Sequence, residues 1–74
     1  MAIETDAPEG FEEATLHTDN AAYLYAKFNS GKHDNAFHVR VACECGWYFD
    51  EEACEEAAEF FLALADELRR KAAP

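Results

Sequence analysis

The stretch AYLYAKFNSGKHDNAFHVRVACEC, residues 22–45, decides the fold, because two runs within it alternate between apolar and polar side chains. The first run, residues 22–29, has small or apolar residues at every second position: Ala22, Leu24, Ala26 and Phe28. The second run, residues 36–45, repeats this pattern with Phe37, Val39, Val41, Cys43 and Cys45. Such alternation is typical of strands with one buried face. The polar residues between the runs have the length of a hairpin loop, so the stretch predicts an antiparallel hairpin.

A long helix is predicted after this hairpin, over residues 51–71. Asp50 is placed to cap its N-terminus, because the carboxylate can accept hydrogen bonds from the first free backbone amides. Phe49, one residue earlier, can pack on Cys54 and fix the direction in which the chain enters the helix. Acids in the first turn and three basic residues in the last turn suit the helix dipole. Both ends therefore favour a helix of this length.

The apolar positions of this helix recur at the spacing of one helical face. They form a stripe made of Cys54, Ala57, Ala58, Phe61, Leu64, Ala65 and Leu68. Phe60 and Leu62 lie on either shoulder of the stripe, so its width indicates burial on more than one side. One interpretation is a homodimeric scaffold protein, in which the helix, together with Trp47 or Phe60, contacts a second chain.

Upstream of the hairpin, residues 11–18 alternate weakly and are interpreted as a further strand, with a helical turn after Pro8 as the alternative. Residues 1–10 combine three acids with a proline and a glycine, and are interpreted as a flexible acidic leader. The expected fold class is therefore α+β, with a small antiparallel three-stranded meander packed against one long C-terminal amphipathic helix. Residues 11–74 form a single domain in this interpretation.

In this fold the helix covers one face of the sheet, and the other face is left for water or a partner. The covered face is expected to carry Leu24, Phe28, Phe37, Val39 and Val41. The uncovered face is expected to carry Tyr23, Tyr25, Lys27, His38 and Arg40.

Length and composition restrict the protein further. A chain of 74 residues has room for one core, and half of its residues are hydrophobic, too many for a disordered acidic tail. No apolar run approaches the roughly 18 residues that span a bilayer. Residues 1–9 carry acids where a secretory signal carries bases, so a cytoplasmic location without a membrane partner is expected.

The formal net charge of −10 is unevenly distributed. Residues 1–19 carry six acids and no base, residues 20–49 two acids and three bases, and residues 50–74 eight acids and three bases. Opposite its apolar stripe, the helix is expected to expose a row of carboxylates: Glu52, Glu55, Glu56, Glu59 and Asp66. Neighbouring carboxylates in such a row are about 5–6 Å apart, which is comparable to the phosphate spacing of DNA.

The leading hypothesis is a small acidic protein-interaction module that docks on a basic, nucleic-acid-binding groove of a partner protein. Tyr23 and Tyr25 are candidate additional contacts. Phage inhibitors of restriction or CRISPR nucleases imitate nucleic acid in this way, although the comparison rests on charge alone. The alternative is that the acids serve only solubility or a high-salt cytoplasm. Direct binding to nucleic acid is disfavoured by charge repulsion, except for single strands stacked on the tyrosine face.

A zinc-stapled structural domain is the other alternative, because zinc binds cysteine and histidine. The candidate ligands are His38, Cys43, Cys45 and Cys54. Their spacing is poor for zinc, since structural sites usually separate paired ligands by two to four residues. The favoured interpretation is that the three cysteines are small buried hydrophobic residues beneath the helix. No catalytic constellation is recognisable, so neither an enzyme nor a cofactor is expected.

Overall fold

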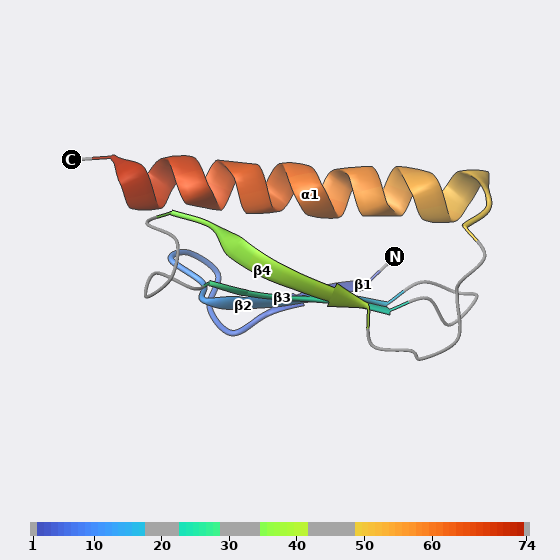
Figure 1. Cartoon of the computed structure of the whole chain (residues 1–74), viewed down its shortest axis with the longest axis horizontal. Helices are drawn as coiled ribbons and strands as arrows, with labels where there is room; N and C mark the ends of the chain where they lie inside the picture. The colour runs from blue at the N-terminus through green and yellow to red at the C-terminus, as the bar shows by residue number, and fades with distance from the viewer. Residues whose placement is uncertain (1, 18–22, 29–34, 42–48, 74) are drawn as a thin grey trace.

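The computed structural model describes residues 2–17, 23–28, 35–41 and 49–73. Over these residues four strands precede one helix: β1 (Ala2–Thr5), β2 (Glu13–His17), β3 (Tyr23–Phe28), β4 (Phe37–Val41) and α1 (Glu51–Ala72). The strands form an antiparallel sheet in the order β1-β2-β3-β4, and α1 lies across one face of it (Figure 1). The predicted α+β class is therefore confirmed, with one strand more than the expected three.

The hairpin that decided the fold is present. β3 and β4 pair in antiparallel register, with Leu24 opposite Val41 and Phe28 opposite Phe37. β2 confirms the strand predicted within residues 11–18, and the alternative of a helical turn there was wrong. The predicted second hairpin strand continued to Cys45, but residues 42–48 lie outside the described part of the chain.

The additional strand, β1, lies within the segment that was interpreted as a flexible leader. That interpretation was wrong for Ala2–Thr5, which pairs along β2 with Ile3 opposite Leu16. Ile3 also packs against the hydrophobic core, so a single apolar side chain helps to hold the strand. Composition alone suggested a loose segment because residues 6–10 combine two acids with a proline and a glycine.

The β1–β2 connection is closed by Asp6. Its carboxylate oxygen Oδ1 accepts hydrogen bonds from the backbone N–H groups of Glu12 at 2.9 Å and Glu13 at 3.0 Å. Gly10 adopts a φ of +67°, a conformation that glycine reaches without the steric cost of a side chain. The acid and glycine that suggested a loose segment therefore shape an ordered turn.

Replacing Asp6 with alanine is expected to loosen β1 and to remove part of the stability at neutral pH. The hydrogen bond from the Glu13 N–H is the largest cause of a lowered Asp6 pKa, below the ordinary value of 3.8. A lowered folded-state pKa contributes stability that is present above the unfolded-state value and is lost as pH falls through the folded-state value. Urea unfolding between pH 6 and pH 2 should therefore show a wild-type advantage over the variant that disappears in acid; an advantage independent of pH would contradict this role.

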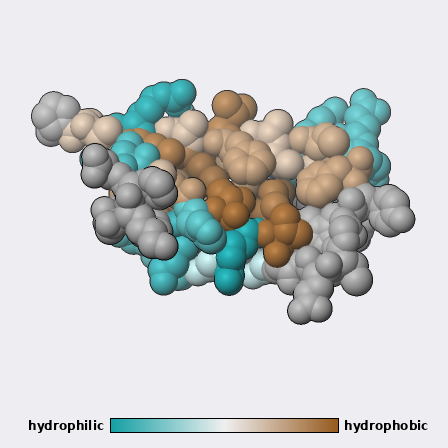
Figure 2. All heavy atoms as spheres, viewed as in Figure 1, coloured by the Kyte–Doolittle hydropathy of each residue, from teal (hydrophilic) through white to brown (hydrophobic). Residues whose placement is uncertain are grey.

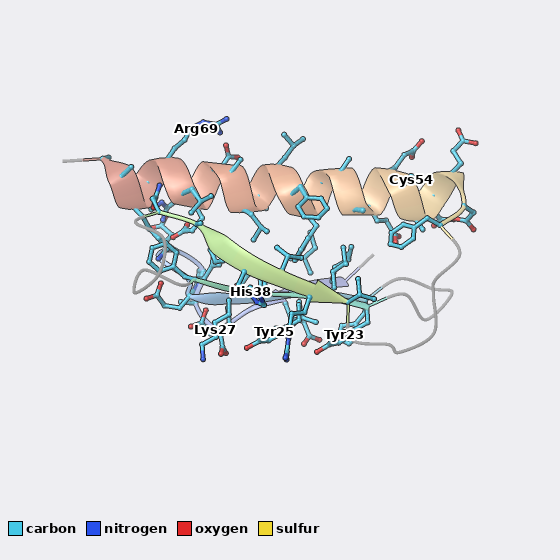
Figure 3. All side chains as sticks on the ribbon, in the orientation of Figure 1. Tyr23, Tyr25, Lys27, His38, Cys54 and Arg69 are labelled. Carbon is cyan, nitrogen blue, oxygen red and sulfur yellow. The ribbon has the colours of Figure 1, made fainter. Side chains whose placement is uncertain are left out.

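The two faces of the sheet differ as expected. Tyr23, Tyr25 and Lys27 project from the side of the sheet away from α1 (Figure 3). Between the sheet and the helix lies one hydrophobic core of buried residues: Phe11, Ala14, Leu16, Leu24, Ala26, Phe60 and Leu64. Phe37 and Val39 are partly buried against this core, whereas Val41 is 54% exposed.

Helix α1 begins as predicted, since Asp50 Oδ1 accepts a hydrogen bond from the Ala53 N–H at 2.8 Å. The orientation of the helix about its own axis differs from the prediction. The residues of α1 that are buried are Ala53, Glu56, Phe60, Leu64 and Glu67. Phe61 is 48% exposed, although it stood at the centre of the predicted stripe. Because successive residues are about 100° apart around a helix, the sheet-facing direction is about one residue away from the predicted one.

Two glutamates occupy the sheet-facing side of α1, and they explain why the hydrophobicity pattern predicted a different orientation of the helix. Glu56 is 8% exposed and Glu67 is 3% exposed. A hydrophobicity pattern assigns glutamate to water, although its aliphatic stem can pack on apolar surface. For Glu67 the cost of burying the charge is reduced by Lys71 Nζ, 3.9 Å from Oε1, and by Arg70 Nε, 3.8 Å from Oε2.

Candidate functional site

Contacts at the C-terminal end of α1 show which side of the helix lies over which edge of the sheet. Asn35, just before β4, donates through Nδ2 to the backbone carbonyl of Leu68 at 2.9 Å. Arg70 is paired with Glu9 of the β1–β2 connection at 3.4 Å. The side of α1 that carries Leu68 therefore lies toward β4, and the side that carries Arg70 lies toward β1 and β2.

The exposed acids of α1 gather on the side toward β1. This acidic flank consists of Glu52, Glu55, Glu59 and Asp66, all exposed. With about 100° between successive residues, these four positions fall within a sector of about 60°. Glu56 was expected in this row, but the sheet buries it, because it lies close to the direction of Phe60. The predicted row of carboxylates is therefore present, but without Glu56.

The negative charge of the acidic flank is concentrated toward the N-terminal half of α1. None of the ion pairs between described residues involves Glu52, Glu55 or Glu59. Asp66 is different, because Arg69 Nη1 lies 2.6 Å from its carboxylate. A shallow hollow of about 460 Å³ lies at the start of the helix, lined by Asp50, Glu51, Glu52 and Glu55. Acids in this position are favoured by the helix dipole.

The basic residues at the other end of α1 are held in ion pairs with acids of this chain. Arg70 contacts Glu9 and Glu67, and Lys71 contacts Glu12 at 2.7 Å. The ammonium of Lys71 also lies 4.7 Å from the ring centroid of Phe28, which is a cation–π distance. These contacts neutralise the charges at the C-terminal end of α1. The electrostatic potential at the helix surface is therefore most negative toward its N-terminus.

Sequence reasoning missed the buried part of this network. Lys71 is only 16% exposed, and its partner Glu67 has one oxygen, Oε1, without a hydrogen bond among the described residues. The available signal was the four-residue spacing of Glu67 and Lys71, which suits a pair on one face of a helix. The pair fixes the end of α1 on the sheet, and through it the direction in which the acidic flank points.

The two tyrosines predicted to share the docking surface lie on the opposite layer of the molecule. The phenol O–H of Tyr25 donates to Glu13 Oε1 at 2.8 Å, and this bond raises the Tyr25 pKa above its ordinary value of 10.0. The guanidinium of Arg40 lies 5.8 Å from the Tyr25 ring centroid. A shallow hollow of about 380 Å³ is lined by Tyr23, Tyr25, Arg40 and Val41. The sheet separates these tyrosines from the acidic flank, so the predicted contacts do not form one surface.

The candidate zinc ligands do not lie together in the described part of the chain. His38 lies on the uncovered face of the sheet, and Cys54 lies on α1, on the other layer. Cys43 and Cys45, like Trp47, lie outside the described residues. Within the described part of the chain, no group of three or more potential ligands could hold a metal ion. The interpretation of Cys54 as a buried hydrophobic residue was wrong, since its thiol is exposed and lies 3.9 Å from the Phe49 carbonyl oxygen.

Across the described residues, no helix combines the length and the apolar character needed to cross a membrane. Comparison of the sequence with protein-family models and with curated proteins, and of the structure with solved structures, gave no match.

Proposed function

We propose that this chain is a small binding module that docks on a positively charged surface of another protein through the acidic flank of α1. The observation that carries the proposal is the exposure of Glu52, Glu55 and Glu59 on one side of the helix, where no ion pair between described residues involves them. Charges arranged in this way are available to a partner without first breaking internal contacts. They would steer association and set its specificity.

The rigidity of α1 supports this proposal. A helix of 22 residues is about 33 Å long, and Glu52, Glu59 and Asp66 recur along it at steps of about 10 Å. The helix backbone therefore holds the carboxylates at a regular spacing before binding. Only their side chains become ordered in the complex, whereas acids on a disordered tail would also incur the cost of ordering the backbone. The helix in turn is fixed by Phe60 and Leu64 in the core and by the Lys71 network at its end.

A groove built for nucleic acid is the partner surface that suits this row best. One DNA strand presents a phosphate for about every 3.4 Å of rise, so about six phosphates correspond to the length from Glu52 to Asp66. The acidic flank offers four carboxylates over that length, and Asp66 shares its charge with Arg69. An inhibitor of this kind would cover the groove as a partial imitation of one strand, and its binding would exclude DNA or RNA.

The experiment compares two variants with the same net charge. Glu55→Gln with Glu59→Gln removes two charges from the acidic flank, and Glu4→Gln with Asp34→Asn removes two charges outside α1. In capture from a lysate of the native host at low salt, the affinity of the first variant for a specific partner is expected to fall roughly thirtyfold, because it loses two charge contacts worth about 1 kcal/mol each. The second variant should bind like the wild type.

The captured partner then gives the quantitative test. Its affinity for the purified chain should fall steeply between 50 mM and 500 mM salt, because screening weakens exposed charge contacts. Added DNA or RNA should compete for the same groove. The proposal is refuted if affinity is insensitive to salt, or if both charge variants weaken binding equally. If salt weakens binding but nucleic acid does not compete, only the imitation of nucleic acid is excluded.

A further inference from the structure

The predicted apolar stripe of α1 exists, but the sheet covers only part of it. About 100° around the helix from Phe60, on the side of Leu68 and β4, lies an apolar flank made of Cys54, Ala57, Ala58, Phe61, Ala65 and Leu68. Phe61 is 48% exposed, and Cys54 and Ala58 are exposed as well. A sector of this composition is normally buried, so its position beyond the sheet edge suggests that something else covers it.

The edge of the sheet beneath this flank is also apolar. Among the described strands β4 is the last in the sheet order, and Val41 on it is 54% exposed. Figure 2 shows apolar side chains gathered along the seam between α1 and β4, in the middle of that face of the molecule. β4 contains no proline or lysine, and its one formally charged side chain, Arg40, lies over the Tyr25 ring on the uncovered face of the sheet, so few of the features that protect an edge strand from pairing are present.

We infer that this seam binds a second copy of the chain, with the two β4 strands pairing antiparallel about a two-fold axis through Val39. Such pairing places Phe37 opposite Val41 and His38 opposite Arg40 of the second copy. The register keeps all six apolar side chains on the face that carries the helices, as the two-residue period of a strand requires. An alternating strand of five residues with apolar side chains at both ends and at its centre is complementary to itself.

The charge distribution selects a second copy as the occupant. Two chains that each carry −10 repel one another over most of their surfaces. The apolar flank and residues 35–41 contain no acid, whereas Glu52, Glu55, Glu59 and Asp66 lie on the opposite flank of α1. The seam is therefore a place where two copies can approach without facing carboxylates, while a strongly basic protein would be drawn to the acidic flank instead.

The position of the axis along α1 follows from the contact at its end. α1 runs antiparallel to β4 (Figure 1), and Asn35 is bonded to Leu68. Val39 lies about 13 Å farther along the strand, which corresponds to about nine residues of helix. Nine residues before Leu68 is position 59, so the axis passes between Ala58 and Phe61 of the apolar flank, and the Phe61 rings of the two copies would lie within about 3 Å of its level and meet across it. The two acidic flanks would lie on the outer sides of the pair and remain free for a partner.

Sedimentation equilibrium of the purified chain over micromolar to millimolar concentrations tests the inference. The wild type is expected to show a concentration-dependent doubling of mass. Phe61→Glu should weaken association by at least about tenfold, because it places two charges near the axis and removes two rings from the contact. Leu62→Glu is the matched control: it adds the same charge on the same helix, at a side chain that is 63% exposed and points away from the sheet. It should associate like the wild type.

Two further measurements show whether the association uses this seam. Phe61 packs edge-on against Phe60 with ring centroids 5.7 Å apart, so its replacement could disturb the core. Val41→Lys, which changes the other half of the seam, should weaken association equally while the helical circular dichroism is unchanged. Amide exchange along β4 should slow as concentration rises. A wild type that stays monomeric at millimolar concentration overturns the inference. The inference is also overturned if Leu62→Glu weakens association as much as Phe61→Glu does, or if association leaves amide exchange along β4 unchanged. These results are independent of the docking proposal, which concerns the other flank.

Discussion

Phe60→Ala is expected to lower the free energy of unfolding by about 3–5 kcal/mol, the usual cost of removing a large aromatic side chain from a core. Phe60 is fully buried and belongs to the core cluster between α1 and the sheet. A chain of 74 residues has roughly 0.05–0.15 kcal/mol of stability per residue, so this loss would remove about a quarter or more of the total. Urea unfolding followed by circular dichroism, at one fixed chain concentration because association shifts stability, measures the loss.

The neighbouring residue provides the control for this prediction. Phe61 has the same side chain and is 48% exposed, so Phe61→Ala should cost only about 1 kcal/mol at concentrations where the chain is monomeric. The contrast between the two variants depends on the orientation of α1 and not on helix propensity, since the substitution is the same. If Phe61→Ala lowered the free energy of unfolding more than Phe60→Ala does, the result would support the orientation that the apolar stripe predicted.

Lys71→Met is expected to destabilise the chain by about 2 kcal/mol. The substitution keeps an unbranched apolar stem but removes the ammonium that contacts Glu12 at 2.7 Å and Glu67 at 3.9 Å. Breaking a buried ion pair typically costs about 3–5 kcal/mol, and the smaller figure reflects the remaining contact between Arg70 and Glu67. Thermal or urea unfolding at neutral pH gives the value.

A second substitution shows whether the cost comes from the buried carboxylate. Adding Glu67→Leu to Lys71→Met removes the charge that was left behind, so most of the lost stability should return. Arg69→Met is the surface control, because Arg69 and Asp66 are 71% and 79% exposed and should contribute less than about 0.5 kcal/mol. Equal costs for Lys71→Met and Arg69→Met would mean that Glu67 is not buried beneath the helix end.

The strands and the helix could be predicted from the sequence where local patterns decide the structure. Alternation over residues 22–29 and 36–45 was sufficient for β3 and β4, because each residue lies on the face that its polarity suggests. The Asp50 cap was also correct, since a cap depends on residues within one turn. β1 could not be predicted in this way: its pairing depends on Asp6 bonding to Glu12 and Glu13, six and seven residues away.

The orientation of α1 could not be predicted from the spacing of its apolar residues, for a different reason. Many of its apolar positions are alanine, which packs equally well on several sides and defines no single face. The sheet-facing direction is instead set by Phe60 and by Glu67, whose burial depends on Lys71, Arg70 and the distant Glu12 network. An apolar stripe read from spacing therefore combined part of the core with a surface that the sheet leaves open. The membership of Glu56 in the acidic row was wrong for the same reason.

Both proposed surfaces depend on the direction in which α1 faces the sheet, and nuclear Overhauser contacts from the phenylalanine rings measure it directly. With Phe60 in the core, its ring protons should show contacts to the methyl groups of Leu16 and Leu24, which belong to the same buried cluster. The Phe61 ring should lack those contacts at concentrations where the chain is monomeric. Strong contacts from Phe61 to Leu16 and Leu24, with none from Phe60, would contradict the orientation, and with it both the acidic flank and the apolar flank defined by it.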